Sequence, residues 1–134
     1  EGRVRLAQNW HQPQAGWAVD AMKNIVQGDP WPRVEVVMSY AGASGSTVDA
    51  LVRDGVQGLV VAATGNGTLH HALQAALERA QQAGLSVRVT TRCPLGQVLS
   101  LPWVDAALPL VLGLTAVKAR VSLLLELLGA KAPA

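Results

Sequence analysis

Residues 58–83 read GLVVAATGNGTLHHALQAALERAQQA, and this stretch decides the fold of the chain. Its first six residues form a short apolar run, which predicts a buried strand. A loop with two glycines follows at residues 64–68. From residue 69 to 83 the apolar side chains share one helical stripe, made by Leu69, Leu73, Ala76, Leu77 and Ala80. Gly84 marks the end of this helix. The stretch therefore predicts a strand–loop–helix unit of an α/β fold.

The same alternation of strand and helix continues on both sides of this unit. Residues 34–40 (VEVVMSY) are a β-branched apolar run that predicts a buried strand, and residues 86–91 (SVRVTT) predict a further strand. Between the first two strands, Ser46 and Asp49 resemble a capping box that opens a short helix ending near Asp54. Connections of this length imply right-handed crossovers and a parallel sheet. We therefore expect a small three-layer α/β domain with three or four parallel strands flanked by helices.

The C-terminal third contains one further clear element. Residues 92–113 hold three prolines and predict at most one short strand, near 108–112. Thr115 is placed to cap a helix over residues 116–128, with Gly129 just past its end. Val117, Val121, Leu124 and Leu128 share one face of that helix, and Leu123, Leu125 and Leu127 widen the apolar surface. A helix that is apolar nearly all round is typical of a buried or interface position.

The first 33 residues differ from the rest. They are polar, with one short amphipathic pattern (Trp17, Ala21, Ile25) that ends at Gly28. Residues 29–33, DPWPR, contain two prolines and disfavour both helix and sheet interior. We therefore expect residues 1–33 to form a linker or N-terminal arm and residues 34–134 to form the domain.

The composition restricts the function classes. Half of the 134 residues are hydrophobic and 15% are charged, which fits one domain that buries part of its surface against a partner, or an Ala/Val/Leu-rich monomer. The net charge of +2 comes from scattered residues and aromatics make up only 4%, so nucleic-acid binding is not expected. No apolar stretch reaches the ~20 residues of a membrane span. The single cysteine excludes an internal disulfide and does not distinguish cytoplasm from periplasm.

Two loops are candidates for ligand binding, because ligands of open parallel sheets bind beyond the carboxyl ends of the strands. These loops are residues 40–47 and residues 64–68. Thr68 falls at the predicted N-cap of the long helix, where free amides and the helix dipole favour a carboxylate or phosphate. The alternative is that Thr68 only caps its own helix, while Gly65 and Gly67 make a tight turn.

Known catalytic motifs do not fit. His70 stands where a dinucleotide fingerprint needs its third glycine, and Ser44 is not in a nucleophile elbow. His70 and His71 point about 100° apart on a helix, so they do not form a metal-binding pair and are expected to be surface or packing residues. Cys93 has no base beside it in the sequence. We therefore expect no catalytic residue, no metal site and no cofactor in this chain.

Four segments, taken together, resemble a known family. They are residues 34–44 (VEVVMSYAGAS), 58–68 (GLVVAATGNGT), 87–96 (VRVTTRCPLG) and 113–120 (GLTAVKAR). In order and spacing they resemble the C-terminal domain of bacterial-type L-asparaginases. The resemblance implies a two-domain homodimer or homotetramer that hydrolyses L-asparagine to L-aspartate and ammonia without a metal. It also implies that the catalytic threonines belong to the first domain, and that the site is shared with a neighbouring subunit.

The resemblance assigns roles to one loop. Thr68 matches the family position that reaches into the neighbour's site near the substrate's α-amino or carboxylate end, and Asn66 and Gly67 shape that loop. A family glutamate that contacts the substrate amine has no clear counterpart: Ser100 falls near its position, and Asp105 is the candidate substitute. The isolated chain is then expected to be inactive. Two alternatives are a stand-alone module that binds a small carboxylate, and a domain of a related amidohydrolase such as the tRNA-linked amidotransferases.

Overall fold

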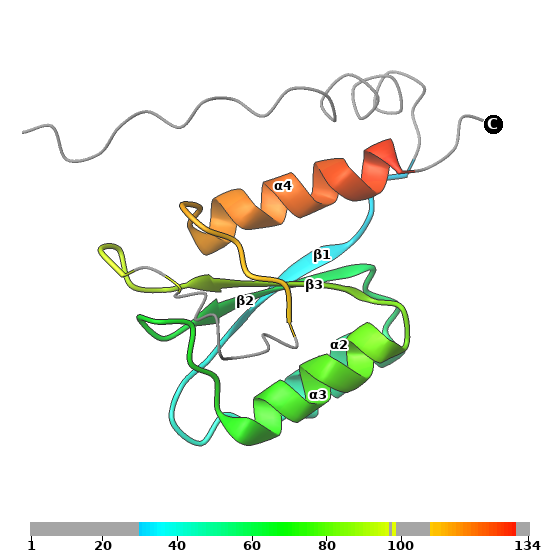
Figure 1. Ribbon diagram of the computed structural model, residues 1–134. Helices are drawn as coiled ribbons and strands as arrows, with labels where there is room; N and C mark the ends of the chain where they lie inside the picture. The colour runs from blue at the N-terminus through cyan, green and yellow to red at the C-terminus, as the bar shows by residue number, and fades with distance from the viewer. Residues whose placement is uncertain (1–29, 97, 99–107, 131–134) are drawn as a thin grey trace, which may run out of the picture.

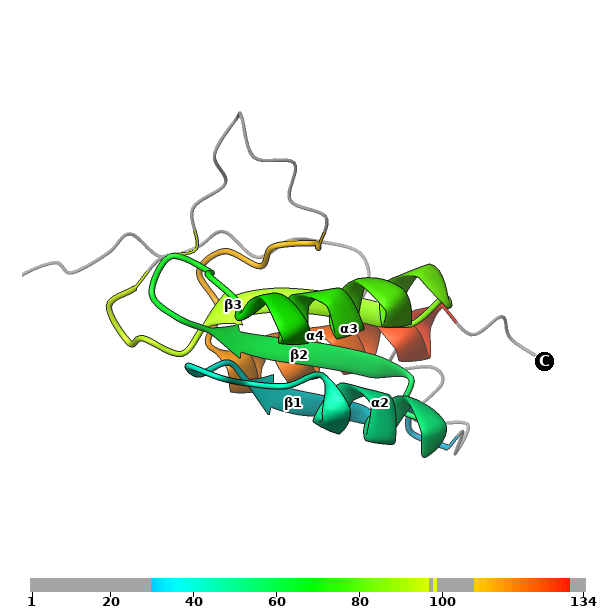
Figure 2. The same ribbon diagram turned by 90° about the horizontal axis from the view of Figure 1, so that it is seen from below.

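The computed structural model describes residues 30–96, 98 and 108–130 of the chain, and Figure 1 shows three layers. A parallel sheet lies between helix α4 on one side and helices α2 and α3 on the other. In the view from below, α2 and α3 lie side by side in front of the sheet and α4 lies behind it (Figure 2). The elements in chain order are β1 (Val34–Met38), α2 (Ser46–Arg53), β2 (Gly58–Ala63), α3 (His71–Gln82), β3 (Ser86–Thr91) and α4 (Ala116–Gly129). The predicted small α/β domain is thereby confirmed.

The described sheet has three parallel strands in the order β1-β2-β3. β2 is the central strand, and all six of its residues are buried, as its unbroken apolar run predicts. The strand predicted near residues 108–112 is only a single parallel bridge between Val89 and Leu110. It is held by hydrogen bonds of 2.8 Å from Val89 N to Pro109 O and from Val111 N to Val89 O. Because Pro109 has no N–H, it cannot extend this ladder by another rung.

The two faces of the sheet carry separate hydrophobic cores. Alternate residues of β2 supply them: Leu59, Val61 and Ala63 pack with α2 and α3, whereas Val60 packs with α4. Gly58 lies on the α4 side, where an added Cβ would be 2.9 Å from Cδ2 of Leu123. The glycine therefore allows α4 to approach the sheet closely.

The apolar face of α4 is divided between the core and the surface. The sequence places Val117, Val121, Leu124 and Leu128 on one face, and the structure leaves Val117 and Val121 70% and 48% exposed. The buried residues of the helix are Ala119, Leu123, Leu124 and Leu128. The apolar residues surround most of the helix, so their period does not determine which stripe meets the sheet. The small side chain of Ala119 allows the close contact that a valine would hinder.

Two element starts and ends also differ from expectation. β1 ends at Met38 rather than Tyr40, because the chain turns at Gly42 (φ +78°) with a hydrogen bond of 3.0 Å from Ala43 N to Tyr40 O. The capping box of α2 is absent: the N-cap is Gly45, and Ser46 Oγ instead lies 2.7 Å from Ser44 Oγ.

Gly45 is also a contact point between the first loop and α3. A Cβ at this position would be 2.5 Å from the Cβ of Ala76, so a capping side chain has no room there. Among the described helices, none is long and apolar enough to cross a membrane. The predicted helix within residues 17–28 lies outside the described residues, and its role as part of an arm stays a prediction.

Candidate functional site

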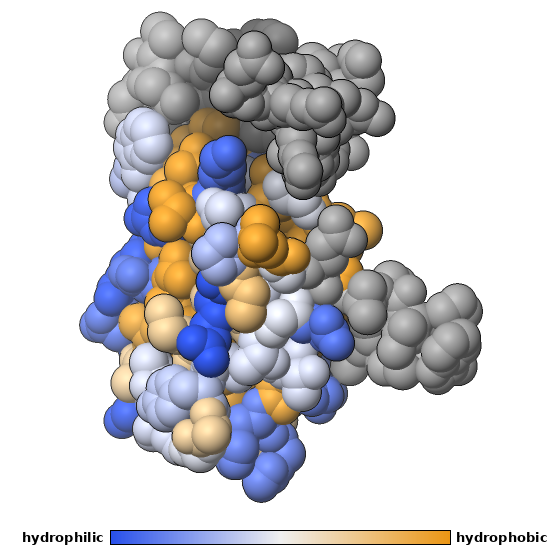
Figure 3. Space-filling model, turned by 90° about the vertical axis from the view of Figure 1, so that its left-hand side faces the viewer, coloured by the Kyte–Doolittle hydropathy of each residue, from blue (hydrophilic) through white to orange (hydrophobic). Residues whose placement is uncertain are grey.

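The loops that follow the three strands lie together at one end of the sheet, which is the left-hand end in Figure 1. They are residues 39–45 after β1, residues 64–70 after β2, and residues 92–96 after β3. Figure 3 looks onto this end of the molecule. Apolar residues gather in its upper half, at the height of α4, and the lower half is mainly pale or blue. Parallel strands thus bring both loops that the sequence predicts to the same edge.

The loop after β2 is a tight turn closed by its own backbone. Gly67 N donates to Thr64 O at 2.8 Å, and the carbonyl of Thr68 accepts from both Thr64 N (3.3 Å) and Thr64 Oγ1 (3.0 Å). Gly67 has φ +91°, and an added Cβ would be 2.7 Å from Cγ1 of Val98. Both the backbone angle and the space at this position therefore require glycine.

The end of β3 supports this loop from one side. Arg92 N donates to Ala63 O at 2.8 Å, and Thr91 Oγ1 donates to Thr64 O at 3.4 Å while accepting from Cys93 N at 3.0 Å. Sequence reasoning assigned Thr91 no role beyond its strand. The only sequence feature that could have indicated this supporting role is a pair of threonines directly before the Arg-x-Pro-x-Gly segment. The hydroxyls of Thr64 and Thr91 thus support the loop from within.

With the loop closed by these bonds, two of its side chains face outward. Asn66 and Thr68 are exposed, and neither side chain has a hydrogen-bond partner among the described residues. The exposed guanidinium of Arg92 at the same edge also has no partner within the described part of the chain. An amide, a hydroxyl and a cation can together bind a small polar ligand that carries a carboxylate.

Thr68 does not cap α3, so this part of the prediction is wrong. The carbonyl of Thr68 already accepts two bonds from Thr64, and the chain stays extended until His70 (φ −67°, ψ 136°). The cap is His70, whose Nδ1 accepts from Ala72 N at 3.4 Å. The helix therefore begins beyond Thr68, and the amide of Ala72 is bound by His70 rather than by Thr68.

The other candidates do not assemble into a catalytic group. The rings of His70 and His71 lie 4.2 Å apart at the start of α3, and His70 is a cap rather than a free surface residue. Ser46 is the only side-chain partner of Ser44 in the described chain. Among the same residues, His, Cys, Asp and Glu do not gather in a group of three or more that could hold a metal. Ser100 and Asp105 lie outside the described residues.

Comparison with known proteins decides the family. The model of the Glutaminase/Asparaginase C-terminal domain matches residues 33–132. The chain belongs to this family. A solved structure of a probable cytoplasmic L-asparaginase from Campylobacter jejuni matches 73% of the chain with a TM-score of 0.65 and 34% sequence identity. The resemblance and the fold class expected from the sequence are both confirmed.

Relatives within this family have more than one function. An L-asparaginase of Bacillus licheniformis is 33% identical over 69 residues, or 52% of this chain. A glutamyl-tRNA(Gln) amidotransferase component of Pyrococcus furiosus is 28% identical over 101 residues, or 71% of the chain. The matched segments make up 21% and 23% of these two relatives, and 33% of the Campylobacter structure. The chain therefore spans only a fifth to a third of the proteins that it resembles.

Proposed function

We propose that this chain is the C-terminal part of an L-asparaginase, which hydrolyses L-asparagine to L-aspartate and ammonia. In this proposal residues 1–33 are a linker or arm and residues 34–134 are the domain. The domain supplies a substrate-side loop to the active site of a neighbouring subunit in a homodimer or homotetramer. The catalytic threonines lie in the other domain, so the isolated chain is inactive.

The observation that carries the proposal is the loop after β2. Its backbone is held from within, and the side chains of Asn66 and Thr68 are left exposed at the carboxyl edge. In the proposed role, the Thr68 hydroxyl hydrogen-bonds the α-amino or α-carboxylate end of the substrate, Asn66 and Gly67 shape the loop, and the chemistry occurs at the amide end.

Exposed apolar side chains support the assembly part of the proposal. Val36 and Met38 of β1 are 40% and 55% exposed, on the same face of the strand as Val34, which packs under α4. Val117 and Val121 lie on the flank of α4 that also carries Leu124 and Leu128. β1 is the edge strand of the described sheet and Arg120 bonds α4 to it, so two neighbouring elements expose apolar surface here. Such a surface is typical of a protein–protein contact.

A chimeric enzyme tests the proposal. Residues 33–132 replace the matching C-terminal segment of the Bacillus licheniformis L-asparaginase, and ammonia release from asparagine is measured. We expect the chimera to be active and the 134-residue chain alone to release no ammonia. Turnover by the isolated chain at the rate of the relative would contradict the proposal.

The role of Thr68 is tested in the same chimera by Thr68→Val. A lost hydrogen bond to a charged group corresponds to about 1.5–3 kcal/mol, so KM should rise by roughly 10- to 100-fold. The value of kcat should change little, because this contact is made equally in the ground state and the transition state. Ser86→Ala is the control, since Ser86 carries a hydroxyl at the start of β3, at the end of the sheet opposite the loop.

Two other functions predict different results. A stand-alone carboxylate-binding module predicts that the isolated chain binds aspartate tightly in calorimetry, whereas a half-site should bind it very weakly. The Pyrococcus furiosus relative is part of an amidotransferase, and it favours a domain of that branch as the second candidate. That candidate predicts a chimera that is active with the amidotransferase relative and inactive with the asparaginase.

A further inference from the structure

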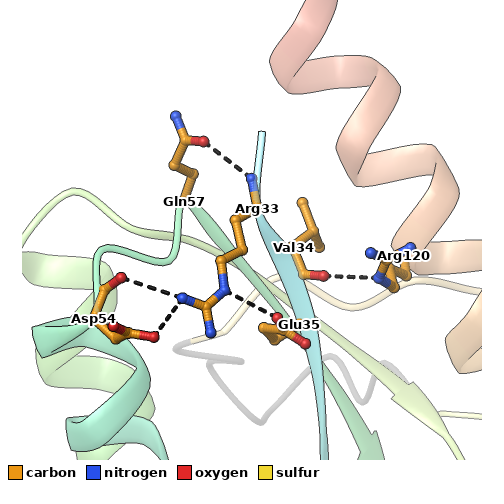
Figure 4. A network of polar contacts seen from close by, with 6 residues as sticks. All are labelled: Arg33, Val34, Glu35, Asp54, Gln57 and Arg120. Carbon is orange, nitrogen blue, oxygen red and sulfur yellow. Dashed lines mark hydrogen bonds and ion pairs between the residues drawn. The ribbon is translucent and has the colours of Figure 1, made fainter. Parts of the chain in front are cut away.

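A cluster of polar contacts surrounds Arg33 at the end of the sheet opposite the candidate loop, where the chain enters β1 (Figure 4). The N–H of Arg33 donates to Oε1 of Gln57 at 3.0 Å. Its carbonyl accepts from Gln57 N at 2.9 Å and from Gly58 N at 3.2 Å. Both backbone polar groups of this residue are thus bound by the segment that leads into β2.

The guanidinium of Arg33 joins two further elements. Nε donates to Oε1 of Glu35 at 3.0 Å on β1, and Nη1 donates to the carboxylate and the backbone carbonyl of Asp54 at the end of α2. The hydrogen bond to Asp54, followed by the one to Glu35, raises the pKa of Arg33 above its ordinary value. One fixed cation therefore connects the entry of the domain to β1 and to α2.

The next residue is held from the opposite face. Nε of Arg120 on α4 donates to the carbonyl of Val34 at 2.7 Å. The start of β1 is thus bound by α2, by the turn before β2 and by α4. The Arg33 side chain is 43% exposed, and ion pairs at such positions contribute little to stability. A planar guanidinium held between two carboxylates does, however, fix the direction in which the chain enters β1.

We propose that Arg33 is a positioning residue. It anchors the point where residues 1–32 join the domain, so that the loop at residues 64–68 keeps one orientation relative to the rest of the proposed enzyme. The anchoring stands on the contacts of Arg33 alone, and the effect on the loop rests on the proposed function. The two parts therefore have separate tests.

Trp31 reports on the anchoring in the 134-residue chain. It lies two residues before Arg33 and is 59% exposed. Phenylalanine at Trp10, Trp17 and Trp103 leaves it as the only tryptophan of the chain. We expect Arg33→Gln to increase the amplitude of nanosecond depolarisation in its time-resolved anisotropy by about twofold. Adding ~1 M salt to the chain with Arg33 intact should also increase this amplitude, because salt screens the exposed ion pairs.

The matched control is Arg53→Gln. Arg53 lies in the last turn of α2, next to Asp54, but among the described residues its side chain bonds only to the Asp49 carbonyl of its own helix, from Nε at 3.2 Å. This variant should leave the Trp31 anisotropy unchanged. If Arg33→Gln does not fold, Asp54→Asn removes the acceptor charge and keeps the backbone contacts. Unchanged anisotropy in a folded Arg33→Gln or Asp54→Asn variant, or an equal change in Arg53→Gln, would overturn the anchoring.

The chimeric enzyme tests the positioning, because Arg33 is the first residue of the grafted segment and lies at its junction with the preceding chain of the relative. There, Arg33→Gln should raise KM for asparagine by about three- to tenfold with kcat changed less than about twofold, and Arg53→Gln should change neither. An unchanged KM in the chimera, together with increased depolarisation of Trp31 in the 134-residue chain, would overturn the proposed effect of Arg33 on the loop. A chimera without any activity would count against the proposed function, and the Trp31 measurement would still decide the anchoring.

Discussion

Substitution of Gly67 by alanine should destabilise the domain through two separate effects. Gly67 has φ +91°, and an L-residue in the left-handed region costs about 1–2 kcal/mol. The new Cβ would also be 2.7 Å from Cγ1 of Val98, a buried side chain that is 6% exposed. Overpacking of this kind costs about 1–3 kcal/mol. Together these effects predict a loss of about 2–5 kcal/mol, a large part of the ~5–15 kcal/mol that stabilises a typical domain.

The chain offers a matched control that separates the two effects. Gly84 also has φ +91°, but an added Cβ there meets nothing within 4 Å. Gly84→Ala should therefore cost only the backbone strain of about 1–2 kcal/mol. Val98→Ala removes the clashing methyl groups, so the Gly67→Ala and Val98→Ala effects should be non-additive, with a coupling of about 1–2 kcal/mol.

Urea unfolding followed by far-UV circular dichroism measures these free energies through the midpoint and the m-value. The order of stability should be the unsubstituted chain, then Gly84→Ala, then Gly67→Ala. A loss of stability in Gly67→Ala no greater than that in Gly84→Ala, or a cycle with Val98→Ala that shows no coupling, would contradict the predicted clash with Val98.

Two further predictions use the same unfolding assay. His70→Ala removes the side-chain acceptor of Ala72 N and should cost about 0.5–2 kcal/mol, whereas His70→Asn keeps a capping oxygen and should recover most of that loss; an equal loss in both variants would contradict the capping role. Thr90 is 1% exposed and donates its hydroxyl to the carbonyl of Leu114, so Thr90→Val should cost about 1–3 kcal/mol. Thr47→Val at the surface should stay within about 0.5 kcal/mol, and an equally small effect at Thr90 would refute the importance of that bond.

The strands could be predicted from the sequence because their signal is local. β2 begins and ends where its apolar run indicates, because both faces of this central strand meet a hydrophobic layer. β3 also spans the predicted residues 86–91. The start of α3 could not be predicted in this way. Thr68 and His70 are both plausible caps, and the choice between them depends on the bonds from Thr64 to the Thr68 carbonyl. Local pattern does not contain that information.

Contacts between segments that are far apart in the sequence could not be predicted either. Arg33 and Asp54 are 21 residues apart, and the support of Thr64 by Thr91 spans 27 residues. The inward face of α4 is a similar case, because its phase depends on Gly58 of β2, which leaves room for Leu123. The loop that contains Asn66, Gly67 and Thr68 was located correctly at the carboxyl edge, and its role in binding substrate stays a prediction.

The chemistry available at this edge supports the proposed binding role. A hydroxyl nucleophile needs a base within hydrogen-bond reach, about 2.6–3.2 Å away. No carboxylate or imidazole bonds to the hydroxyl of Ser44 or Thr68 within the described part of the chain. What the loop does offer is rigidity, since Thr64 and Thr91 hold its backbone before any ligand arrives. A contact that is ordered in advance adds affinity without the entropic cost of ordering a loop. In the proposed shared active site we expect this advantage in KM, which is the quantity that Thr68→Val and Arg33→Gln should both change.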